Sequence, residues 1–436
     1  MNNILIKNAM IMTLESKDSI LQNGFIGITG DRVSYVGVAA PESFVPDQVI
    51  DGSHRAVLPG LINMHSHSPM VLMRSYADDL CLQDWLFKKI FPLEAELSPE
   101  DVYWGSLHAI MEMVSSGITC FTDMYFHADE IARAVKESGI RACLCTGLNN
   151  VGKTGDFSNN RYIIENKQLF KEWNGEGNGR ISVYLGPHSI YTCDPEFLRY
   201  IAEVAGQLDT GIHIHVSETA KENYECIEKY GKTPVALLEE VGLLSSKTLA
   251  AHCVHITDED MDILKEKEVS IVYNPSSNLK LGSGIIPLKR VLQKGINVAL
   301  GTDGASSNNN LNMFEEMNLA ALISKGVEMD PTLVDAYQAL QMATVNGAKA
   351  LGKEMEFGRI RPGMKADLTL INLDKLHLYP MYNIVSNSIY SAQASDVETV
   401  IIDGKVVMKD REFTTIDREQ VIYNLKRIAD RISGIL

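Results

Sequence analysis

Between about residue 59 and residue 357, short apolar runs alternate with segments of helical period. Eight of these runs are candidate strands: 57–65, 117–123, 141–146, 181–186, 211–216, 248–252, 269–273 and 297–301. Helical stretches between them include 99–116, 128–138, 195–208 and 258–267. This rhythm predicts an α/β fold, a closed parallel (β/α)₈ barrel of the TIM type. A doubly wound open sheet is the alternative, but it does not usually place polar residues at so many strand ends.

The two ends of the chain have a different pattern from the middle. Short strands separated by turns are expected at 4–6, 9–14, 24–28 and 32–37. Strand-like runs return at 367–372 and 397–407, and a helical period follows at 416–435. We therefore expect residues 1–57 and 358–436 to complete one small β-sandwich with a terminal helix, beside a barrel of residues 58–357.

Charge and cysteine content restrict the partners and the compartment. The chain has 56 acidic and 40 basic residues, a formal net charge of −16. Nucleic acid and anionic membranes call for a basic surface, so neither is expected as the main partner. The seven cysteines include no CxxC pair, which is typical of reduced, buried thiols. No run approaches the roughly 18 apolar residues of a membrane span, and no signal peptide is recognisable, so we expect a soluble cytoplasmic protein.

The strongest sign of chemistry is His65-Ser66-His67, at the end of the first strand of the barrel region. Residues i and i+2 of a strand point to the same face, so these two imidazoles are expected side by side. Taken alone, such a pair is more often hydrogen-bonded in place than bound to a metal. In a parallel barrel the carboxyl ends of the strands surround one site, so the other strand ends decide the question.

Those other strand ends also carry residues that bind metals. They supply His188 after 181–186, His215 and Glu218 at the end of 211–216, His252 at the end of 248–252, and Asp303 after 297–301. Imidazoles and a carboxylate suit a borderline divalent ion such as Zn²⁺, which lowers the pKa of bound water to about 7. Singly, Asp303 could belong to a turn and His252 could be a core histidine. Their shared position at one end of the barrel predicts a metal site.

The remaining histidines and one cysteine near these motifs are expected to be structural. His213 shares the face of His215 but lies deeper along the strand, so we place it inside the barrel. Cys253 should point to the opposite face from His252 and is expected to pack in the core. His108, His127 and His255 have no comparable spacing and are expected to be structural or to lie behind the site.

The residues quoted above, with Pro59-Gly60-Leu61 and Gly301-Thr302-Asp303, together resemble the aminohydrolase branch of the amidohydrolase superfamily. Further stretches are similar to the 5′-methylthioadenosine/S-adenosylhomocysteine deaminases: Met124-Tyr125-Phe126-His127, Gly186-Pro187-His188-Ser189, Ala251-His252-Cys253-Val254-His255, Asn274 to Leu281, and Gly301 to Ala305. The resemblance covers nearly the whole chain, including the split sandwich.

The resemblance implies both a ligand set and a reaction. By position, the metal ligands would be His65, His67, His215 and Asp303, holding one divalent ion, Zn²⁺ first, with Fe²⁺ or Mn²⁺ as alternatives. Glu218 would protonate the ring nitrogen next to the attacked carbon, and Asp303 would accept the proton of the attacking water. His252 would orient that water and stabilise the new oxygen. The reaction implied is hydrolysis of the 6-amino group of an adenine nucleoside to the inosine analogue and ammonia.

The resemblance also implies substrate contacts. Glu94 matches the family's acid for the ribose hydroxyls, although it could be one more surface acid in an acidic segment. His188 matches a substrate-contacting histidine, and Trp85 is expected to line the pocket or to lie in the core. The family often has an arginine where this chain has Thr146, and threonine cannot pair with the carboxylate of S-adenosylhomocysteine. This puts S-adenosylhomocysteine in doubt as the substrate and leaves adenosine, 5′-deoxyadenosine and 5′-methylthioadenosine at least as plausible. A homo-oligomer is a family expectation.

Other functions stay open at this point. Hydrolysis of cyclic amides or phosphotriesters generally uses a carboxylated lysine in the fourth strand, but 181–195 contains no lysine, which favours a single metal. A deaminase of guanine or a triazine would share the metal residues, and Glu94 discriminates because these rings carry no ribose. A barrel that only binds ligands is disfavoured by the intact acid Glu218. The Pro-Cys-x-x-Cys signature of cytidine-type zinc deaminases is absent.

Overall fold

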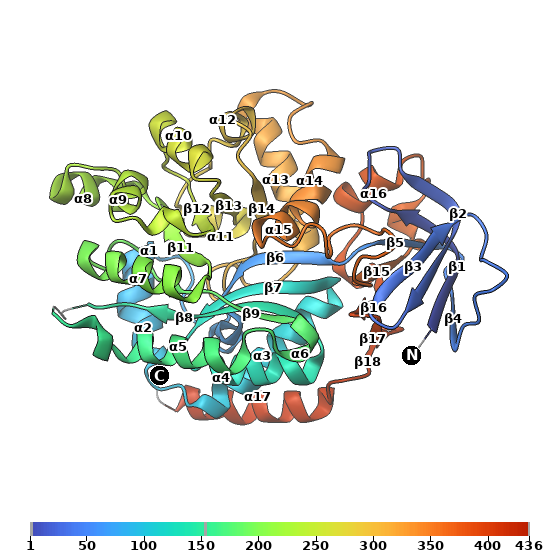
Figure 1. Ribbon diagram of the computed structural model, residues 1–436, viewed down its shortest axis with the longest axis horizontal. Helices are drawn as coiled ribbons and strands as arrows, with labels where there is room; N and C mark the ends of the chain where they lie inside the picture. Colours follow the sequence, from blue (N-terminus) through green and yellow to red (C-terminus); the bar gives the residue numbers. More distant parts are fainter. Residues whose placement is uncertain (1–2, 152–154, 435–436) are drawn as a thin grey trace.

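The computed structural model describes residues 3–151 and 155–434 (Figure 1). Its centre is a ring of parallel strands: β6 (Leu61–Ser66), β7 (Ile118–Tyr125), β8 (Arg141–Leu148), β9 (Ile181–Val183), β10 (Gly186–Pro187), β11 (Ile212–Val216), β12 (Thr248–His252), β13 (Ser270–Tyr273) and β14 (Val298–Leu300). Almost every residue in these strands is buried, as expected for a parallel sheet covered on both faces.

The ring is made of two sheets that join at both edges. One contains β6 to β10 and the other β11 to β14. At one seam Leu185 bridges to Ile212, and the His213 N–H donates to the Leu185 carbonyl at 2.9 Å. At the other seam the Asp303 N–H donates to the His65 carbonyl at 2.9 Å. This is the predicted (β/α)₈ architecture, and the second seam brings two chemically important residues together.

Helices cover the outside of the ring. The longer ones are α3 (Pro99–Ser115), α4 (Ala128–Ser138), α5 (Arg161–Trp173), α7 (Pro195–Leu208), α8 (Ala220–Tyr230), α10 (Asp258–Glu266) and α13 (Met313–Glu328), with α9 (Pro234–Glu240), α12 (Leu288–Gln293), α14 (Ala336–Met342) and α15 (Val345–Ala350) shorter. Side-chain caps fix several helix starts, including the capping box of Ser98 with Asp101. The four predicted helices agree with the structure to within one residue at each end. Within the described ranges, no helix is long and apolar enough to cross a membrane.

Strands from both chain ends form one nine-stranded sheet within the described residues. These strands are β1 (Asn3–Met12), β2 (Ile20–Thr29), β3 (Arg32–Gly37), β4 (Gln48–Asp51), β5 (Arg55–Pro59), β15 (Leu368–Asn372), β16 (Val397–Ile402), β17 (Lys405–Lys409) and β18 (Glu412–Phe413). The two ends meet where β5 pairs with β15, Val57 opposite Leu370. Both ends also share a separate apolar core that includes Ile4, Ile26 and Leu368. The chain ends therefore complete one small domain beside the barrel (Figure 1).

The predicted strand 57–65 is two strands. Its first part belongs to β5, which pairs with β15, and its second part is β6, which pairs with β7 in the barrel. The break is at Gly60, where an added Cβ would lie 2.0 Å from Thr119 Oγ1. Glycine lets the backbone pass this close to β7 while it crosses from one sheet to the other. The expected division after residue 57 falls inside β5.

Several other boundaries differ from the sequence pattern. The runs 4–6 and 9–14 are one strand, β1, with an irregular register between Ile6 and Ala9. The run 181–186 is interrupted between β9 and β10, and 397–407 turns back at Asp403-Gly404 between β16 and β17. The segment 416–435 contains α17 (Arg418–Ser433), and residue 435 lies outside the described residues. Local irregularities of this kind depend on tertiary pairing and leave little trace in apolar periodicity.

A helical segment that the sequence pattern did not predict lies between β6 and α3. It consists of α1 (Leu82–Trp85), the π-turn η2 (Leu86–Ile90) and α2 (Phe91–Glu94). The segment is part of the long connection between the first barrel strand and α3, which places it at the carboxyl ends of the strands. It carries Trp85, Phe91 and Glu94, and π-turns of this kind occur frequently at functional sites.

Buried ion pairs join the barrel to the small domain at the amino end of β8. Arg141 Nε donates to Asp367 Oδ2 at 2.9 Å, and Arg141 Nη2 lies 3.5 Å from Asp403 Oδ1. Lys365 Nζ donates to the same Asp403 oxygen at 2.8 Å. All four side chains are buried. Removing one partner would leave an uncompensated charge between the two domains.

We expect Arg141→Met to lower the free energy of unfolding by about 3–5 kcal/mol, because Asp367 and Asp403 lose a buried partner. Urea unfolding followed by circular dichroism measures this change. Lys136→Met is the matched control, since Lys136 and Glu176 form an exposed pair at 3.2 Å that should be worth less than about 1 kcal/mol. Equal losses in both variants would contradict a joining role for Arg141.

Candidate metal centre and substrate pocket

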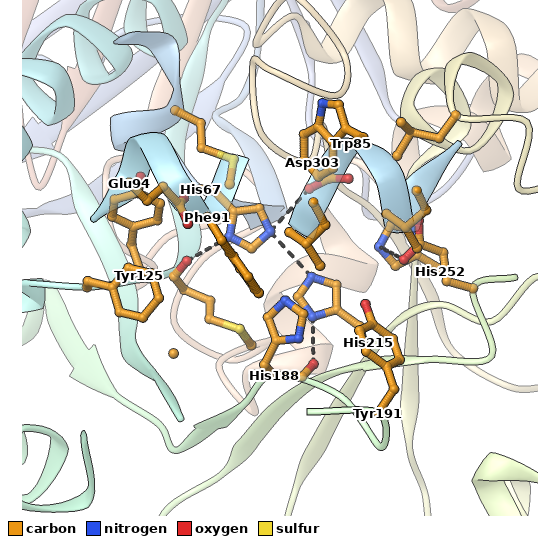
Figure 2. Close-up of a pocket in the computed structure, with 18 residues that line it drawn as sticks. His67, Trp85, Phe91, Glu94, Tyr125, His188, Tyr191, His215, His252 and Asp303 are labelled. Atoms are coloured by element: carbon orange, nitrogen blue, oxygen red, sulfur yellow. Dashed lines mark hydrogen bonds and ion pairs between the residues drawn. The ribbon is translucent and has the colours of Figure 1, made fainter. Parts of the chain in front are cut away.

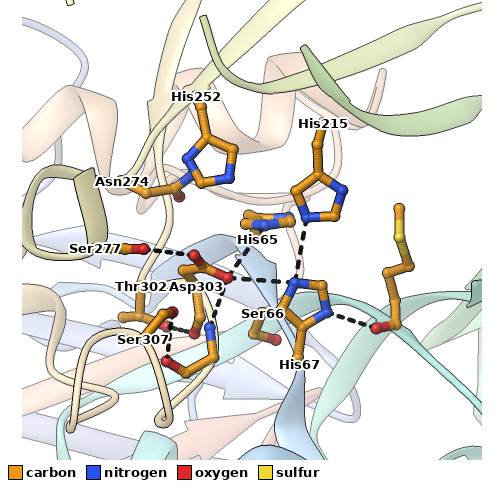
Figure 3. A network of polar contacts seen from close by, with 12 residues as sticks. His65, Ser66, His67, His215, His252, Asn274, Ser277, Thr302, Asp303 and Ser307 are labelled. Carbon is orange, nitrogen blue, oxygen red and sulfur yellow. Dashed lines mark hydrogen bonds and ion pairs between the residues drawn. The ribbon is translucent and has the colours of Figure 1, made fainter. Parts of the chain in front are cut away.

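His65, in β6, and His67, directly after β6, point toward Asp303 in the turn after β14 (Figure 3). His65 Nε2 lies 3.4 Å and His67 Nε2 lies 3.2 Å from Asp303 Oδ1. His67 Nε2 is also 3.3 Å from the Nε2 atom of His215, at the end of β11. His252, at the end of β12, offers a further nitrogen within 4.8 Å of those of His65 and His215. Side chains distant in the sequence therefore converge at one point.

Hydrogen bonds at Nδ1 determine which nitrogen each ligand histidine presents. His67 Nδ1 donates to the Met124 carbonyl, and His215 Nδ1 donates to the His188 carbonyl, both at 2.7 Å. A carbonyl can only accept, so in the neutral rings the lone pair is on Nε2. His65 Nε2 is buried and has no hydrogen-bond partner in the described part of the chain. Three imidazoles with one carboxylate and an orphaned buried nitrogen fit a divalent metal ion.

Asp303 is held rigidly in the turn after β14. Its backbone has a φ of +61°, the Gly304 N–H donates to Oδ1 at 2.7 Å, and the Ser277 hydroxyl donates to Oδ2 at 2.6 Å. Burial alone would raise the pKa of Asp303, but His65 and His67 hold it well below its usual range. Burial likewise opposes protonation of His67, yet Asp303 raises its pKa to about 9. A metal ion must therefore compete with a proton for His67.

Glu218 and His252 lie beside the ligand cluster. Glu218 Oε2 is 3.9 Å from His252 Nε2, and the Ser283 hydroxyl donates to Glu218 Oε1 at 3.3 Å. Both side chains are almost completely buried. Burial raises the pKa of Glu218, with His252 acting in the opposite direction, and this shift favours the protonated form that an acid needs.

Glu222 supports Glu218 and was not singled out in the sequence. Its carboxylate accepts the backbone N–H of Ser217 at 3.1 Å and that of Glu218 at 2.8 Å. Ser217 has a φ of +49°, so these bonds hold a strained turn that aims Glu218 at the site. The spacing Thr219-x-x-Glu222 matches a capping box and predicts only the start of α8. It does not reveal that the glutamate side chain turns back to the preceding strand.

Asp123, near the end of β7, likewise holds the backbone around His67 in place. Its carboxylate accepts the hydroxyl of Ser66 at 2.8 Å, the backbone N–H of Ser68 at 2.7 Å and the hydroxyl of Ser68 at 2.8 Å. These bonds hold the backbone on both sides of His67. The only sequence signal for Asp123 was a polar residue at a predicted strand end. That signal does not distinguish Asp123 from other acids near the strand ends.

The ligand cluster forms the floor of a pocket (Figure 2). Its walls are mainly apolar and come from the segment α1 to α2, including Leu82, Trp85, Leu86 and Phe91. One side of the pocket contains the candidate metal ligands with Glu218 and His252, and the other contains Glu94 and Tyr125 (Figure 2). Trp85 thus lines the pocket. An apolar slot with polar groups at both ends suits a flat heterocycle that carries a polar substituent.

Glu94 is buried at its own end of the pocket. Its Oε1 atom and the Tyr125 hydroxyl both lack a hydrogen-bond partner among the described residues. Burial raises the pKa of Glu94 to about 7, with Tyr125 and His67 acting in the opposite direction. Buried polar atoms are rarely left unpaired in proteins, so these two oxygens mark a place where a ligand is expected to bind.

His188 lies between the two ends of the pocket. It follows β10, its ring centroid is 4.7 Å from that of His215, and its Nδ1 is 3.1 Å from the hydroxyls of Ser189 and Thr192. The structure therefore places eight of the predicted site residues around one pocket: His67, Trp85, Glu94, His188, His215, Glu218, His252 and Asp303. His65 does not line the pocket but lies against His67 and Asp303.

The prediction that residue 146 determines the accepted substituent is wrong. Side chains alternate along β8, so Gly147 lines the pocket while Thr146 borders a separate groove with Glu165 and Leu169. The Thr146 N–H donates to Asn166 Oδ1 at 2.7 Å, which fixes this orientation. A side chain at position 146 faces helix α5, away from the pocket.

Comparison with known proteins agrees with this geometry. The amidohydrolase family model matches residues 56–407. The chain is 52% identical over 433 residues to the 5-methylthioadenosine/S-adenosylhomocysteine deaminase of Acetivibrio thermocellus, covering 99% of each protein. It is 50% identical over 430 residues to that of Thermoanaerobacter pseudethanolicus, again covering 99% of each. An adenosine deaminase from Xanthomonas campestris with bound zinc has a TM-score of 0.94 and 33% identity, over 99% of both chains. The chain therefore belongs to the amidohydrolase family, within its group of 5-methylthioadenosine/S-adenosylhomocysteine deaminases.

Proposed function

We propose that this chain is a metal-dependent aminohydrolase that converts the 6-amino group of an adenine nucleoside to a keto group, with release of ammonia. The observation that carries the proposal is one pocket with two chemically distinct ends. A buried acid, Glu218, stands beside the metal-ligand cluster at one end, and the unpaired Glu94 stands at the other. The names of the relatives and of the zinc-containing neighbour support the same reaction.

The metal would be held by His65, His67, His215 and Asp303. Nitrogen and oxygen donors of this kind favour a borderline ion, so we propose zinc, with Fe²⁺ or Mn²⁺ as alternatives. When bound, the ion supplies Lewis acidity that lowers the pKa of a ligated water to about 7. A homo-oligomer and a cytoplasmic location stay predictions from the resemblance and the composition.

The protein side chains supply the proton transfers. Glu218, whose pKa burial raises, would donate a proton to the ring nitrogen next to the carbon that carries the amino group. This protonation draws electrons from the ring, which otherwise resists attack by water. Asp303 would accept the proton of the attacking water through the carboxylate that Ser277 and Gly304 hold in place. His252 would orient that water and stabilise negative charge on the oxygen.

At the far end of the pocket, Glu94 would accept hydrogen bonds from the two ribose hydroxyls. The apolar walls between the two ends would then enclose the adenine ring. No lysine or arginine occurs among the described residues that line this pocket. This composition favours an uncharged 5′ group, as in adenosine, 5′-deoxyadenosine or 5′-methylthioadenosine, over the amino-acid group of S-adenosylhomocysteine.

A substrate panel tests the reaction class. We expect the zinc-loaded protein to release ammonia from adenosine, 5′-deoxyadenosine and 5′-methylthioadenosine with similar kcat/KM values. Guanine and a chlorotriazine should be poorer by about 10²-fold or more, because a ring without ribose leaves buried Glu94 unpaired. Ultraviolet absorbance and ammonia release measure all substrates together. A preference for guanine or the triazine would refute the nucleoside assignment, and a strong preference for S-adenosylhomocysteine would refute the proposed 5′ selectivity.

Glu218→Gln tests the proposed acid. We expect kcat for adenosine to fall by about 10²–10⁴-fold, because the amide keeps the shape of the side chain but cannot donate the proton in the same way. The zinc content should stay unchanged, as measured by elemental analysis of the same sample. Glu225→Gln, on the exposed face of α8, is the control and should keep full activity. Activity within a few-fold of the unmodified protein would rule out Glu218 as the acid.

Glu94→Gln tests the ribose contact and its dependence on pH. Hydrogen bonds to a charged group are worth about 1.5–3 kcal/mol, so KM should rise about 10- to 100-fold with little change in kcat. The pKa of Glu94 is raised to about 7, so the accepting carboxylate forms only as the pH passes neutrality. In the unmodified protein kcat/KM should therefore rise between about pH 6 and pH 8, and this rise should flatten in the variant.

Two controls make the Glu94 test specific. 2′,3′-Dideoxyadenosine should be a poorer substrate than adenosine for the unmodified protein, but the two should be nearly equal for the Glu94→Gln variant. Glu96→Gln changes an exposed acid two residues away and should change neither KM nor the pH profile. If the variant still prefers adenosine to its dideoxy analogue, Glu94 does not bind the ribose.

A further inference from the structure

His65 differs from the other two ligand histidines in what holds its ring. His67 and His215 each donate from Nδ1 directly to a main-chain carbonyl, which fixes their tautomers. The Nδ1 atom of His65 instead lies 2.8 Å from Nε2 of a second imidazole, His213. Either ring could donate across this contact. Taken alone, the contact leaves undetermined whether Nε2 of His65 carries a proton or a lone pair.

Two further groups continue the line from His213 to the backbone. The other ring nitrogen of His213, Nδ1, lies 3.8 Å from the sulfur of Cys145, within hydrogen-bond reach for sulfur. The Cys145 thiol donates to the main-chain carbonyl of Asp123 at 3.3 Å. His213 and Cys145 are both buried inside the barrel, on β11 and β8. Three side chains in sequence therefore connect the metal site to one carbonyl oxygen of β7.

The Asp123 carbonyl determines which atom donates and which accepts in each of these hydrogen bonds. The Asp123 carbonyl has no proton, so the Cys145 thiol must donate to it, and the sulfur then offers only lone pairs to His213. The proton of the neutral His213 ring is therefore on Nδ1, and its Nε2 accepts. His65 must then donate from Nδ1, which leaves the lone pair of its Nε2 directed at the ligand cluster.

We propose that His213 and Cys145 are positioning residues that hold His65 in the tautomer able to bind the metal through Nε2. The hydrogen bonds that run from His65 through His213 and Cys145 to the Asp123 carbonyl are called the relay here. The relay fixes the tautomer of His65, as a single carbonyl does for His67 and His215. It rests on the proposed metal centre, but neither residue touches the substrate. Partners outside the metal shell fix ring orientation and basicity in this way, and their loss typically weakens metal binding about 10- to 100-fold.

Burial supports a directional role for these two groups. A histidine and a thiol inside the barrel displace apolar side chains that would pack without any desolvation cost. The neighbouring barrel core contains such residues, including Leu249 and Val272. Burial also raises the pKa of Cys145 well above its usual value, so the thiol keeps the proton that the relay requires.

The first test is zinc affinity of the metal-free protein, measured by competition with a fluorescent chelator. His213→Leu removes the acceptor for His65 Nδ1, and we expect zinc binding to weaken about 10- to 100-fold. In His213→Glu a carboxylate oxygen takes the place of Nε2 and can only accept, so affinity should return to near that of the unmodified protein. Circular dichroism and thermal unfolding of the metal-free variants check that the fold is intact.

The second test uses Cys145, whose effect should depend on the residue at 213. Cys145→Ala should weaken zinc binding about tenfold when His213 is present, because the direction of the relay is lost. It should have no effect beside His213→Glu, since an ionised carboxylate can only accept and needs no further partner to set its direction. Cys143→Ala, the same truncation two residues earlier on β8, is the matched control and should leave affinity unchanged in both backgrounds.

These outcomes separate the relay from simple packing. Unchanged affinity in a folded His213→Leu variant would overturn the proposal, and so would an equal effect of Cys145→Ala in both backgrounds. If His213→Leu does not fold, the comparison of Cys145→Ala with and without His213→Glu carries the test. Zinc affinity is measured without turnover, so failure of the relay is distinguishable from failure of the proposed deamination, which the substrate panel detects.

Discussion

The site depends on several nitrogen and oxygen lone pairs that point toward one position. His67 and His215 are turned by carbonyl groups so that Nε2 points inward, where it meets Asp303 and the unpaired Nε2 of His65. In a buried space such an arrangement is costly unless a cation binds it. The closed barrel brings these side chains together, because strands that are far apart in the chain end at the same rim. The remaining features of the molecule either hold this cluster in place or shape the space above it.

Much of the polar structure around the site restrains backbone turns. Ser217, His252 and Asp303 all follow or end barrel strands and all have positive φ, at 49°, 73° and 61°. Side chains with a Cβ atom adopt this conformation at a cost of about 1–3 kcal/mol, so the surroundings must enforce it. Glu222 and Ser277 supply hydrogen bonds that do so beside Glu218 and Asp303. The protein therefore gives up some stability at the strand ends to position its reactive groups before the substrate binds.

The pocket above this cluster shows where reasoning from the sequence was insufficient. Glu94 and Trp85 were found through family resemblance, but their surroundings came from a helical segment with a π-turn that no apolar period predicts. Thr146 was expected to face the substrate, yet strand alternation turns it toward α5 and exposes Gly147 instead. Glu222 and Asp123 were missed because acids at such positions are common, and only tertiary contacts separate a supporting acid from a solvated one.

The sequence predicted the barrel, the small domain built from both chain ends, and the histidines and acids that meet at the candidate metal site. Short apolar runs, periodic helices and histidines at the ends of those runs are local signals, so they can be recognised without knowledge of the fold. The tertiary structure decided which nitrogen of each histidine faces the site, which face of β8 meets the pocket, and where strand 57–65 passes from one sheet to the other. These features depend on partners that are distant in the sequence, such as the Met124 carbonyl 57 residues from His67, and hydrogen-bond direction is a property of the pair.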